Sequence, residues 1–147
     1  MADNTMYLEF PSKAENVSFA RTAVAAFVSQ LDPTMPELAD ISTAVSEGVT
    51  NVVVHAYPSG EGPIAITVHL AGQQVSIEIR DKGCGIADVD TVRRFGTTTC
   101  GQERMGIGLS LIEACMDHMN IESKEGQGTC LFLSKRLGQQ GGGLAND

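Results

Sequence analysis

Residues 37–57, with the sequence ELADISTAVSEGVTNVVVHAY, determine how the rest of the chain is interpreted. Apolar side chains recur in this stretch every three or four residues, which is the spacing of one buried face of an amphipathic helix. The residues with this spacing are Leu38, Ile41, Val45, Val49 and Val52. Glu47, Asn51 and His55 follow one another at intervals of four residues and share a second face.

A carboxylate one helical turn before a carboxamide is a useful chemical pair. Glu47 can take up a proton, and the amide oxygen of Asn51 can bind a hard cation such as Mg²⁺. The same pattern also describes the solvated face of an ordinary surface helix. Motifs elsewhere in the chain have to distinguish these two interpretations.

The chain has 147 residues, which suits one domain with a substantial buried core. Its 42% apolar and 19% charged residues are typical of a globular protein. The net charge of −8 argues against broad binding to nucleic acid or anionic membranes, so we expect neither as a direct partner. No apolar run approaches the length of a membrane-spanning helix, and the first residues do not resemble a secretory leader, which predicts a cytoplasmic protein.

The cysteines and histidines do not follow a familiar metal-binding pattern. Cys84, Cys100, Cys115 and Cys130 contain no C-x-x-C pair, and we expect four reduced thiols. The histidines lack the spacing of known zinc ligands, which argues against a zinc site.

Alternation and capping patterns predict the other elements. Ser12 with Glu15, and Thr34 with Glu37, predict capping boxes that open a helix ending near Leu31 and the central helix. Gly48 inside the central helix indicates either close packing or a weak point. We expect a third helix at 109–119 and strands at 7–10, 64–70, 75–79, 120–123 and 129–134. Residues 83–105 predict a functional lid, and 138–147 a disordered tail after a single domain at 1–137.

The loop Asp81-Lys82-Gly83-Cys84-Gly85 follows the second strand of a predicted hairpin. An acidic residue and glycines are ordinary in a tight turn. The functional alternative is that the glycines let the backbone approach a flat ring while Asp81 accepts a hydrogen bond from an exocyclic amine. That arrangement favours adenine over guanine, because a guanine carbonyl would face a carboxylate with no proton between them.

The segment Gly106-Ile107-Gly108-Leu109 precedes the third predicted helix, where backbone amides can hold a phosphate. It fits neither the P-loop nor the G-x-G-x-x-G fingerprint, so a nucleotide would be held without the P-loop lysine, and Arg104 could supply the positive charge. Thr97 and Thr98, in the predicted lid, could bind phosphate oxygens or simply solvate the loop. Gly128 and Thr129 open the last strand, where a plain hairpin is an adequate explanation.

The order of these elements is more specific than any of them alone. An E-x-x-x-N helix, D-x-G-x-G after a strand, G-x-G-L before a helix and G-T before a strand resemble the ATP-binding domain shared by gyrase, Hsp90, histidine kinases and MutL. Within that superfamily the chain is similar to the family of sporulation anti-sigma F factors, which are serine kinases. The segments carrying this similarity include 7–10, 18–21, 30–35, 45–47 and 49–51.

This resemblance implies an α+β, Bergerat-type fold: a two-layer sandwich with a mixed β-sheet and helices packed on one face. It implies that Asn51 binds Mg²⁺ on the phosphates of ATP and that Glu47 is the general base. The adenine amine would meet Asp81, with Gly83 and Gly85 shaping the pocket and Thr129 supporting Asp81 through water. The residues expected around the phosphates are Thr97, Thr98, Arg104, Gly106 and Gly108.

The family also implies partners. These are a sigma factor, an anti-anti-sigma protein phosphorylated on serine, and a second copy of the chain in a homodimer. Arg21 and Glu103 match positions that contact the partner. The alternatives are a stress-response relative acting on another sigma factor, and an ATP-gated module that sequesters its partner without useful catalysis. The register of the lid threonines stays open, because the lid is one residue shorter before Phe95 than in the family.

Overall fold

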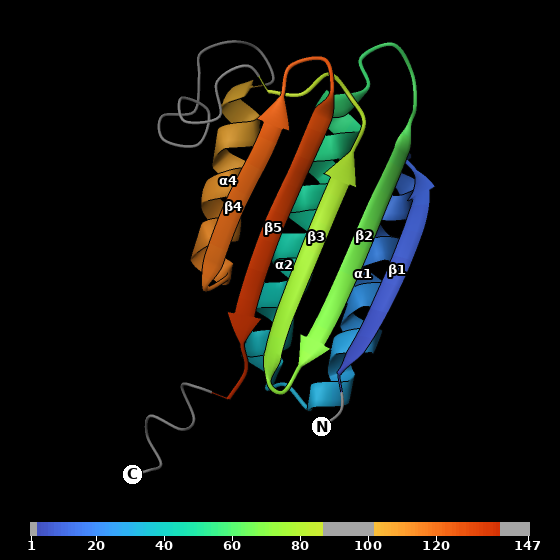
Figure 1. The fold of residues 1–147 in the computed structure, drawn as a ribbon. Coiled ribbons are helices and arrows are strands. Elements are labelled where there is room, and N and C mark those ends of the chain that lie inside the picture. Colours follow the sequence, from blue (N-terminus) through green and yellow to red (C-terminus); the bar gives the residue numbers. More distant parts are fainter. Residues whose placement is uncertain (1–2, 87–101, 139–147) are drawn as a thin grey trace.

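The fold is a five-stranded sheet with helices packed on one of its faces, seen in a computed structural model that describes residues 3–86 and 102–138 (Figure 1). Of residues 102–105 only the backbone is described. The strands are β1 (Asn4–Pro11), β2 (Pro63–Ala71), β3 (Gln74–Asp81), β4 (His118–Lys124) and β5 (Gly128–Arg136). The helices are α1 (Glu15–Val28), η1 (Ser29–Leu31), α2 (Met35–Asn51), η2 (Val52–Ala56) and α4 (Gln102–Cys115). The predicted α+β two-layer architecture is confirmed.

The strand order is β1-β2-β3-β5-β4, and every pairing among the described residues is antiparallel. The expectation of a mixed sheet is therefore wrong in this detail. β3 and β4 do run in the same direction, with α4 between them in the chain. They are not neighbours because the β4–β5 hairpin places β5 between them.

Helix α2 lies across the inner face of the sheet and confirms the predicted central helix. The capping box forms as expected: Glu37 N–H donates to Thr34 Oγ1, and Thr34 N–H donates to Glu37 Oε1 at 2.8 Å. Most of the predicted apolar stripe is buried, although Leu38 is only partly so. A Cβ added to Gly48 would lie 2.7 Å from Ile79 Cδ1, so this glycine permits close packing of helix on sheet.

The first predicted capping box is wrong. α1 begins at Glu15 without a side-chain cap, and Ser12 instead takes part in a turn contact. Ser12 is buried; its N–H donates to the Gly62 carbonyl and its hydroxyl accepts from the Gly62 N–H. The S-x-x-E spacing is correct for a cap, but the Ser12 hydroxyl is hydrogen-bonded to Gly62 of the 57–62 loop and does not cap the helix.

The third helix differs from its predicted bounds at both ends. α4 begins at Gln102 and ends at Cys115, whereas 109–119 was expected. The chain turns back into the sheet at once, because Asp117 N–H donates to the Ser134 carbonyl and Met119 pairs with Leu133 in the ladder. A short apolar stretch fits a helix end and a strand equally well, and only sheet pairing separates them.

The end of β5 is attached to the start of α2, on the side of the molecule away from the β4–β5 turn (Figure 1). Leu137 is buried, and Gly138 N–H donates to Glu37 Oε2 at 2.6 Å. The folded region thus includes Gly138, where the tail was expected to begin, and 139–147 lie outside the described residues.

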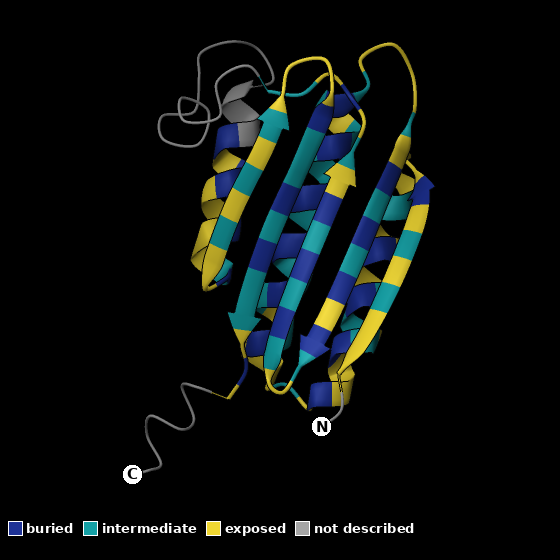
Figure 2. Cartoon of the chain, in the orientation of Figure 1, coloured by how far each residue is buried: buried dark blue, intermediate teal, exposed yellow. Residues whose placement is uncertain are grey.

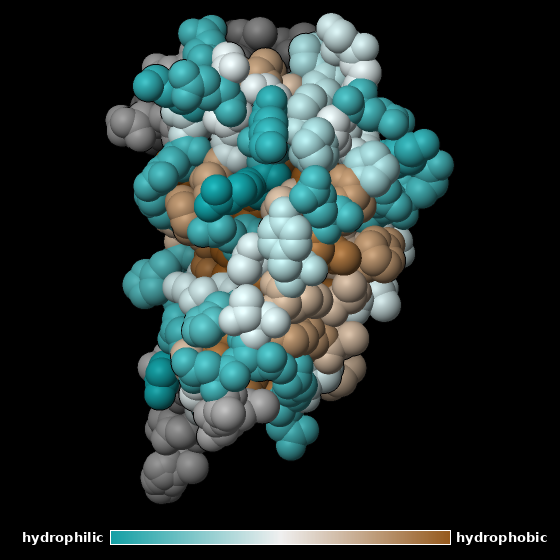
Figure 3. Space-filling model, turned by 45° about the vertical axis from the view of Figure 1, so that its right-hand side comes forward, coloured by the Kyte–Doolittle hydropathy of each residue, from teal (hydrophilic) through white to brown (hydrophobic). Residues whose placement is uncertain are grey.

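Burial alternates along the strands (Figure 2). Most side chains of β2, β3 and β5 that face the helices are buried, while the edge strands β1 and β4 consist of exposed and partly buried residues apart from the buried Phe10 of β1. On the side that carries β1, hydrophilic side chains break up the hydrophobic surface (Figure 3). Within the described ranges, each helix is too short or too polar to span a bilayer.

Candidate functional site

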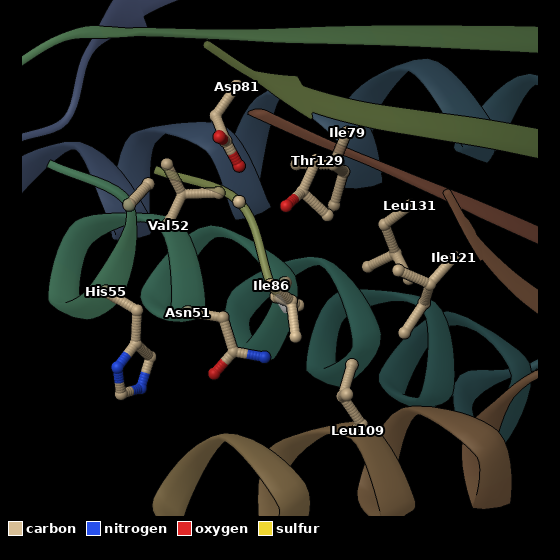
Figure 4. Close-up of a pocket in the computed structure, with 13 residues that line it drawn as sticks. Asn51, Val52, His55, Ile79, Asp81, Ile86, Leu109, Ile121, Thr129 and Leu131 are labelled. Atoms are coloured by element: carbon tan, nitrogen blue, oxygen red, sulfur yellow. The ribbon is translucent and has the colours of Figure 1, made fainter. Parts of the chain in front are cut away.

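A cavity lies between α2, α4 and the inner face of the sheet, near the end where β3 finishes and β5 begins. Its polar lining includes Asn51, His55, Asp81 and Thr129 (Figure 4). The apolar lining comprises Val52, Ala56, Ile79, Ile86, Leu109, Ile121 and Leu131. Four polar residues from four elements, α2, η2, β3 and β5, therefore line one largely apolar cavity, which is the usual character of a small-molecule site.

Asp81 is the last residue of β3 and is only partly exposed. The Gly83 N–H donates to its Oδ1 at 2.8 Å, and the Thr129 N–H also donates to the carboxylate. Burial nevertheless raises the pKa of Asp81, because these two hydrogen bonds offset only part of the lost hydration. A donor supplied by a ligand would complete the partners of this carboxylate.

The glycines after Asp81 do not act quite as predicted. A Cβ on Gly83 would lie 2.2 Å from the Ala56 carbonyl oxygen, and one on Gly85 would lie 2.2 Å from that of Lys124. Gly83 is absent from the cavity lining, whereas Gly85, with φ of +74°, lines it. Close packing against η2, rather than approach to a ring, explains Gly83.

Thr129 is paired with Asp81 across the β3–β5 ladder. Its hydroxyl lies 2.7 Å from that of Ser123, which is also 2.8 Å from the Ile86 N–H. Sequence reasoning missed Ser123, although it ends a predicted strand and β4–β5 pairing places it opposite Thr129. Neither its residue type nor its spacing carried a functional signal.

Glu47 and Asn51 converge where α4 passes over α2. A Cβ on Gly108 would lie 3.1 Å from Glu47 Oε1 and 3.2 Å from Asn51 Oδ1. Gly108 thus lets α4 approach these two side chains closely. The helical spacing predicted that the Glu47 carboxylate and the Asn51 carboxamide lie close together, and this proximity is confirmed.

The expected role of Gly106 and Gly108 as amides at a helix N-terminus is wrong. Both lie inside α4, which begins four residues earlier than Gly106, at Gln102. Their N–H groups are therefore beyond the first turn, where the free amides of a helix are found. A helix was expected to begin after paired glycines, but the close contact with α2 offsets their low helix propensity.

The end of α2 continues into a π-helical turn, η2, that carries His55. The wider turn changes the simple spacing of four residues beyond Asn51, yet His55 and Asn51 still line the same cavity. The spacing gave no indication of this π-turn.

The remaining predicted site residues are less fully described. Thr97 and Thr98 lie outside the described residues. Glu103 and Arg104 occupy the first turn of α4, and only their backbone is described. Arg21 is exposed on α1, where it donates to Ser18 Oγ at 3.4 Å.

Comparison with known proteins identifies the family of the chain. The model of the histidine kinase-like ATPase domain family matches residues 10–135. The anti-sigma F factor of a Thermoanaerobacter species is 45% identical over 136 residues, which cover 92% of this chain and 95% of the relative. That of Pasteuria penetrans is 47% identical over 140 residues, covering 93% of each chain.

Solved structures support the fold. The RsbU and RsbW domains of a Mycobacterium tuberculosis protein match with a TM-score of 0.68 and 23% identity. That match covers 91% of this chain and 32% of the other, so this chain spans about a third of that protein. The histidine kinase domain of a blue-light activated kinase from Erythrobacter litoralis matches with a TM-score of 0.59 and 18% identity, over 89% of this chain and 65% of the other.

Proposed function

The chain belongs to the histidine kinase-like ATPase domain family and, within it, to the anti-sigma F factors, and from this premise we propose that it is an ATP-dependent protein serine kinase that also binds and inhibits a sigma factor. The relatives that carry the anti-sigma F factor name match nearly the whole chain. We extend the proposal to sigma F of sporulation as the partner on the same basis.

The observation that carries the nucleotide part of the proposal is the shared cavity of Asn51, Asp81 and Thr129. The partly buried carboxylate of Asp81 would accept a hydrogen bond from the adenine amine, and the apolar side chains around it would pack against the ring. Gly85 lines the cavity, and Gly83 contributes by holding Asp81 Oδ1. The proposed adenine specificity follows from a carboxylate that requires a donor.

Magnesium fits the donor chemistry beside this cavity. Among the described residues there is no cluster of three or more histidine, cysteine or acidic side chains that could hold a metal alone. Mg²⁺ commonly takes only one or two protein ligands and completes its shell with phosphates and water. Asn51 would supply the one protein oxygen, and the ion would neutralise charge on the phosphates.

Glu47 would accept the proton of the serine hydroxyl during phosphoryl transfer. Its carboxylate converges with Asn51 at Gly108, next to the cavity that would hold the nucleotide. Phosphoryl transfer requires mainly positioning and charge neutralisation, so one base with these neighbours is chemically sufficient. Arg104 in the first turn of α4, with Thr97 and Thr98, remains proposed for the phosphates.

The protein substrate would be an anti-anti-sigma protein phosphorylated on serine, and the active form a cytoplasmic homodimer. Arg21, exposed on α1, and Glu103, on α4, are the proposed contacts with the partner. The net charge of −8 is consistent with protein rather than nucleic-acid partners.

The proposal is tested by incubating the protein with γ-labelled ATP, Mg²⁺ and candidate anti-anti-sigma protein. We expect label on a serine of that protein and capture of a sigma factor by the kinase in pull-downs with ATP and then ADP. Sigma capture without transfer of label would identify an ATP-gated sequestering module instead. Capture of a stress-response sigma factor in place of sigma F would correct the partner.

A further inference from the structure

Ser123, at the end of β4, connects three segments around the floor of the cavity. The Ile86 N–H donates to its hydroxyl oxygen at 2.8 Å. The Ser123 hydroxyl donates to the Gly128 carbonyl at 3.2 Å and lies 2.7 Å from Thr129 Oγ1. One small side chain therefore joins β4, β5 and the residue that follows the glycine-rich loop.

These contacts determine where the protons lie. A serine hydroxyl has one proton to donate, and here the Gly128 carbonyl accepts it. Either hydroxyl could donate across the 2.7 Å contact between Ser123 and Thr129, but only donation by Thr129 leaves the Ser123 proton for the Gly128 carbonyl. With its own proton directed at Ser123, the Thr129 hydroxyl presents only lone pairs to the cavity.

The neighbouring carboxylate also offers only acceptors. Asp81 already receives the N–H groups of Gly83 and Thr129, and its remaining lone pairs face the cavity. The oxygens of Asp81 and Thr129 lie on the same side of the cavity in Figure 4. On the sheet side of the cavity, Asp81 and Thr129 therefore form a pair of hydrogen-bond acceptors, whereas the amide of Asn51 lines the helix side.

We propose that Ser123 is a specificity-determining positioning residue, which directs the Thr129 proton away from the cavity so that the site accepts a purine with an amino group at position 6 and rejects one with a carbonyl. The inference rests on the proposed adenine-nucleotide function. A carbonyl at this position would face acceptors only and would leave its own lone pairs unpaired, which is costly in a dry site.

The matched probes are ADP and IDP. ADP carries an amino group at purine position 6, whereas IDP carries a carbonyl there and a proton on the neighbouring ring nitrogen. We expect the unmodified protein to bind ADP about 100-fold more tightly than IDP or better. In Ser123→Ala the Thr129 hydroxyl is free to turn its proton to the cavity. The ratio of the two dissociation constants should then fall roughly five- to tenfold, mainly through tighter IDP binding.

Three further variants separate specificity from general damage. Ser123→Thr retains the hydroxyl and should restore the ratio. Ser134→Ala, on the outer face of β5, should leave the ratio unchanged. In a Thr129→Val background, Ser123→Ala should have no further effect on the ratio, because the hydroxyl that it releases is gone.

An unchanged ratio in Ser123→Ala, or equal losses for ADP and IDP, would overturn the inference while leaving the proposed function intact. Failure of the unmodified protein to bind ADP would overturn the proposed function and this inference with it. The two failures are therefore distinguishable in a single set of titrations.

Discussion

Each end of the sheet–helix sandwich holds a carboxylate that is at least partly buried, and the pKa values of the two carboxylates are shifted in opposite directions. Glu37, at the start of α2, is 4% exposed, and backbone N–H groups of Thr34 and Gly138 together with the charge of Lys135 lower its pKa despite its burial. Asp81, at the other end, is less deeply buried, yet burial raises its pKa.

The difference lies in how fully each carboxylate is paired. At the Glu37 end, a capping box and the bond to Gly138 satisfy the charge, and the side chain holds the end of β5 against α2. At the Asp81 end, the loops approach so closely that glycine is required, and the carboxylate still faces a cavity. The Glu37 end stabilises the fold. At the other end, Asp81 can still accept a hydrogen bond from a donor that a ligand supplies.

The largest expected effect is on catalysis at the cavity end. Glu47→Gln preserves size but removes the proposed base, so phosphotransfer to serine should fall by about 10²-fold or more. ADP affinity should stay within several-fold of the original, because Glu47 is not among the residues that line the cavity. Rates measured with labelled ATP under single-turnover conditions test this, and an unchanged rate would refute the role of Glu47.

Asp81→Asn should weaken ADP binding by about 100-fold, because an amide cannot replace a charged acceptor held by two backbone N–H groups. The free energy of unfolding without nucleotide should be equal or higher, since a partly desolvated charge is removed. Calorimetric titration and chemical denaturation measure the two quantities. Glu122→Gln, on the exposed face of β4, is the matched control, and parallel loss of stability and affinity would contradict the comparison.

Gly83→Ala tests the close packing at the same end. The added Cβ would collide with the Ala56 carbonyl, and relief of that collision should cost about 1–3 kcal/mol of unfolding free energy. Gly60→Ala is the control, because no atom lies within 4 Å of a Cβ added there. Urea denaturation of both variants measures the difference, and equal stability would show that the loop can move without cost.

Glu37→Gln tests the other end of the molecule. Loss of the charge should cost about 1–2 kcal/mol of unfolding free energy, because two part-buried hydrogen bonds from backbone N–H groups lose a charged acceptor. ADP affinity should not change, since Glu37 is remote from the cavity lining. Glu15→Gln, exposed in the first turn of α1, is the control. A loss of nucleotide affinity in Glu37→Gln would show that the two ends are coupled.

The smallest effect is the pH dependence of stability. The lowered pKa of Glu37 contributes stability above its unfolded-state pKa, and that stability is lost as pH falls through the folded-state value. The raised pKa of Asp81 acts oppositely, because its contribution is present at low pH and is lost as pH rises through the folded-state value. Denaturation at several pH values from about 3 to 7 should show weaker acid destabilisation in Glu37→Gln and stronger in Asp81→Asn. Identical slopes would contradict the opposite pKa shifts.

Local patterns were sufficient for much of the fold and part of the site. The stripe from Ile41 to Val52 predicted α2 because burial of one helical face follows directly from the spacing of apolar residues. Thr34 and Glu37 predicted its start because a capping box involves only neighbouring backbone groups. The helical interval likewise placed Glu47 and Asn51 together, as the contact with Gly108 confirms.

Tertiary structure alone decided the features that depend on distant partners. Ser12 lost its predicted cap to Gly62, and residues 118–119 joined the sheet rather than a helix, because contacts remote in sequence outweighed local preference. Ser123 has no local signal at all; its position follows from the pairing of β4 with β5. The sequence by itself determined which residues are chemically able to bind a nucleotide. The packing of strands and helices decided which hydrogen-bond partners each of these residues has.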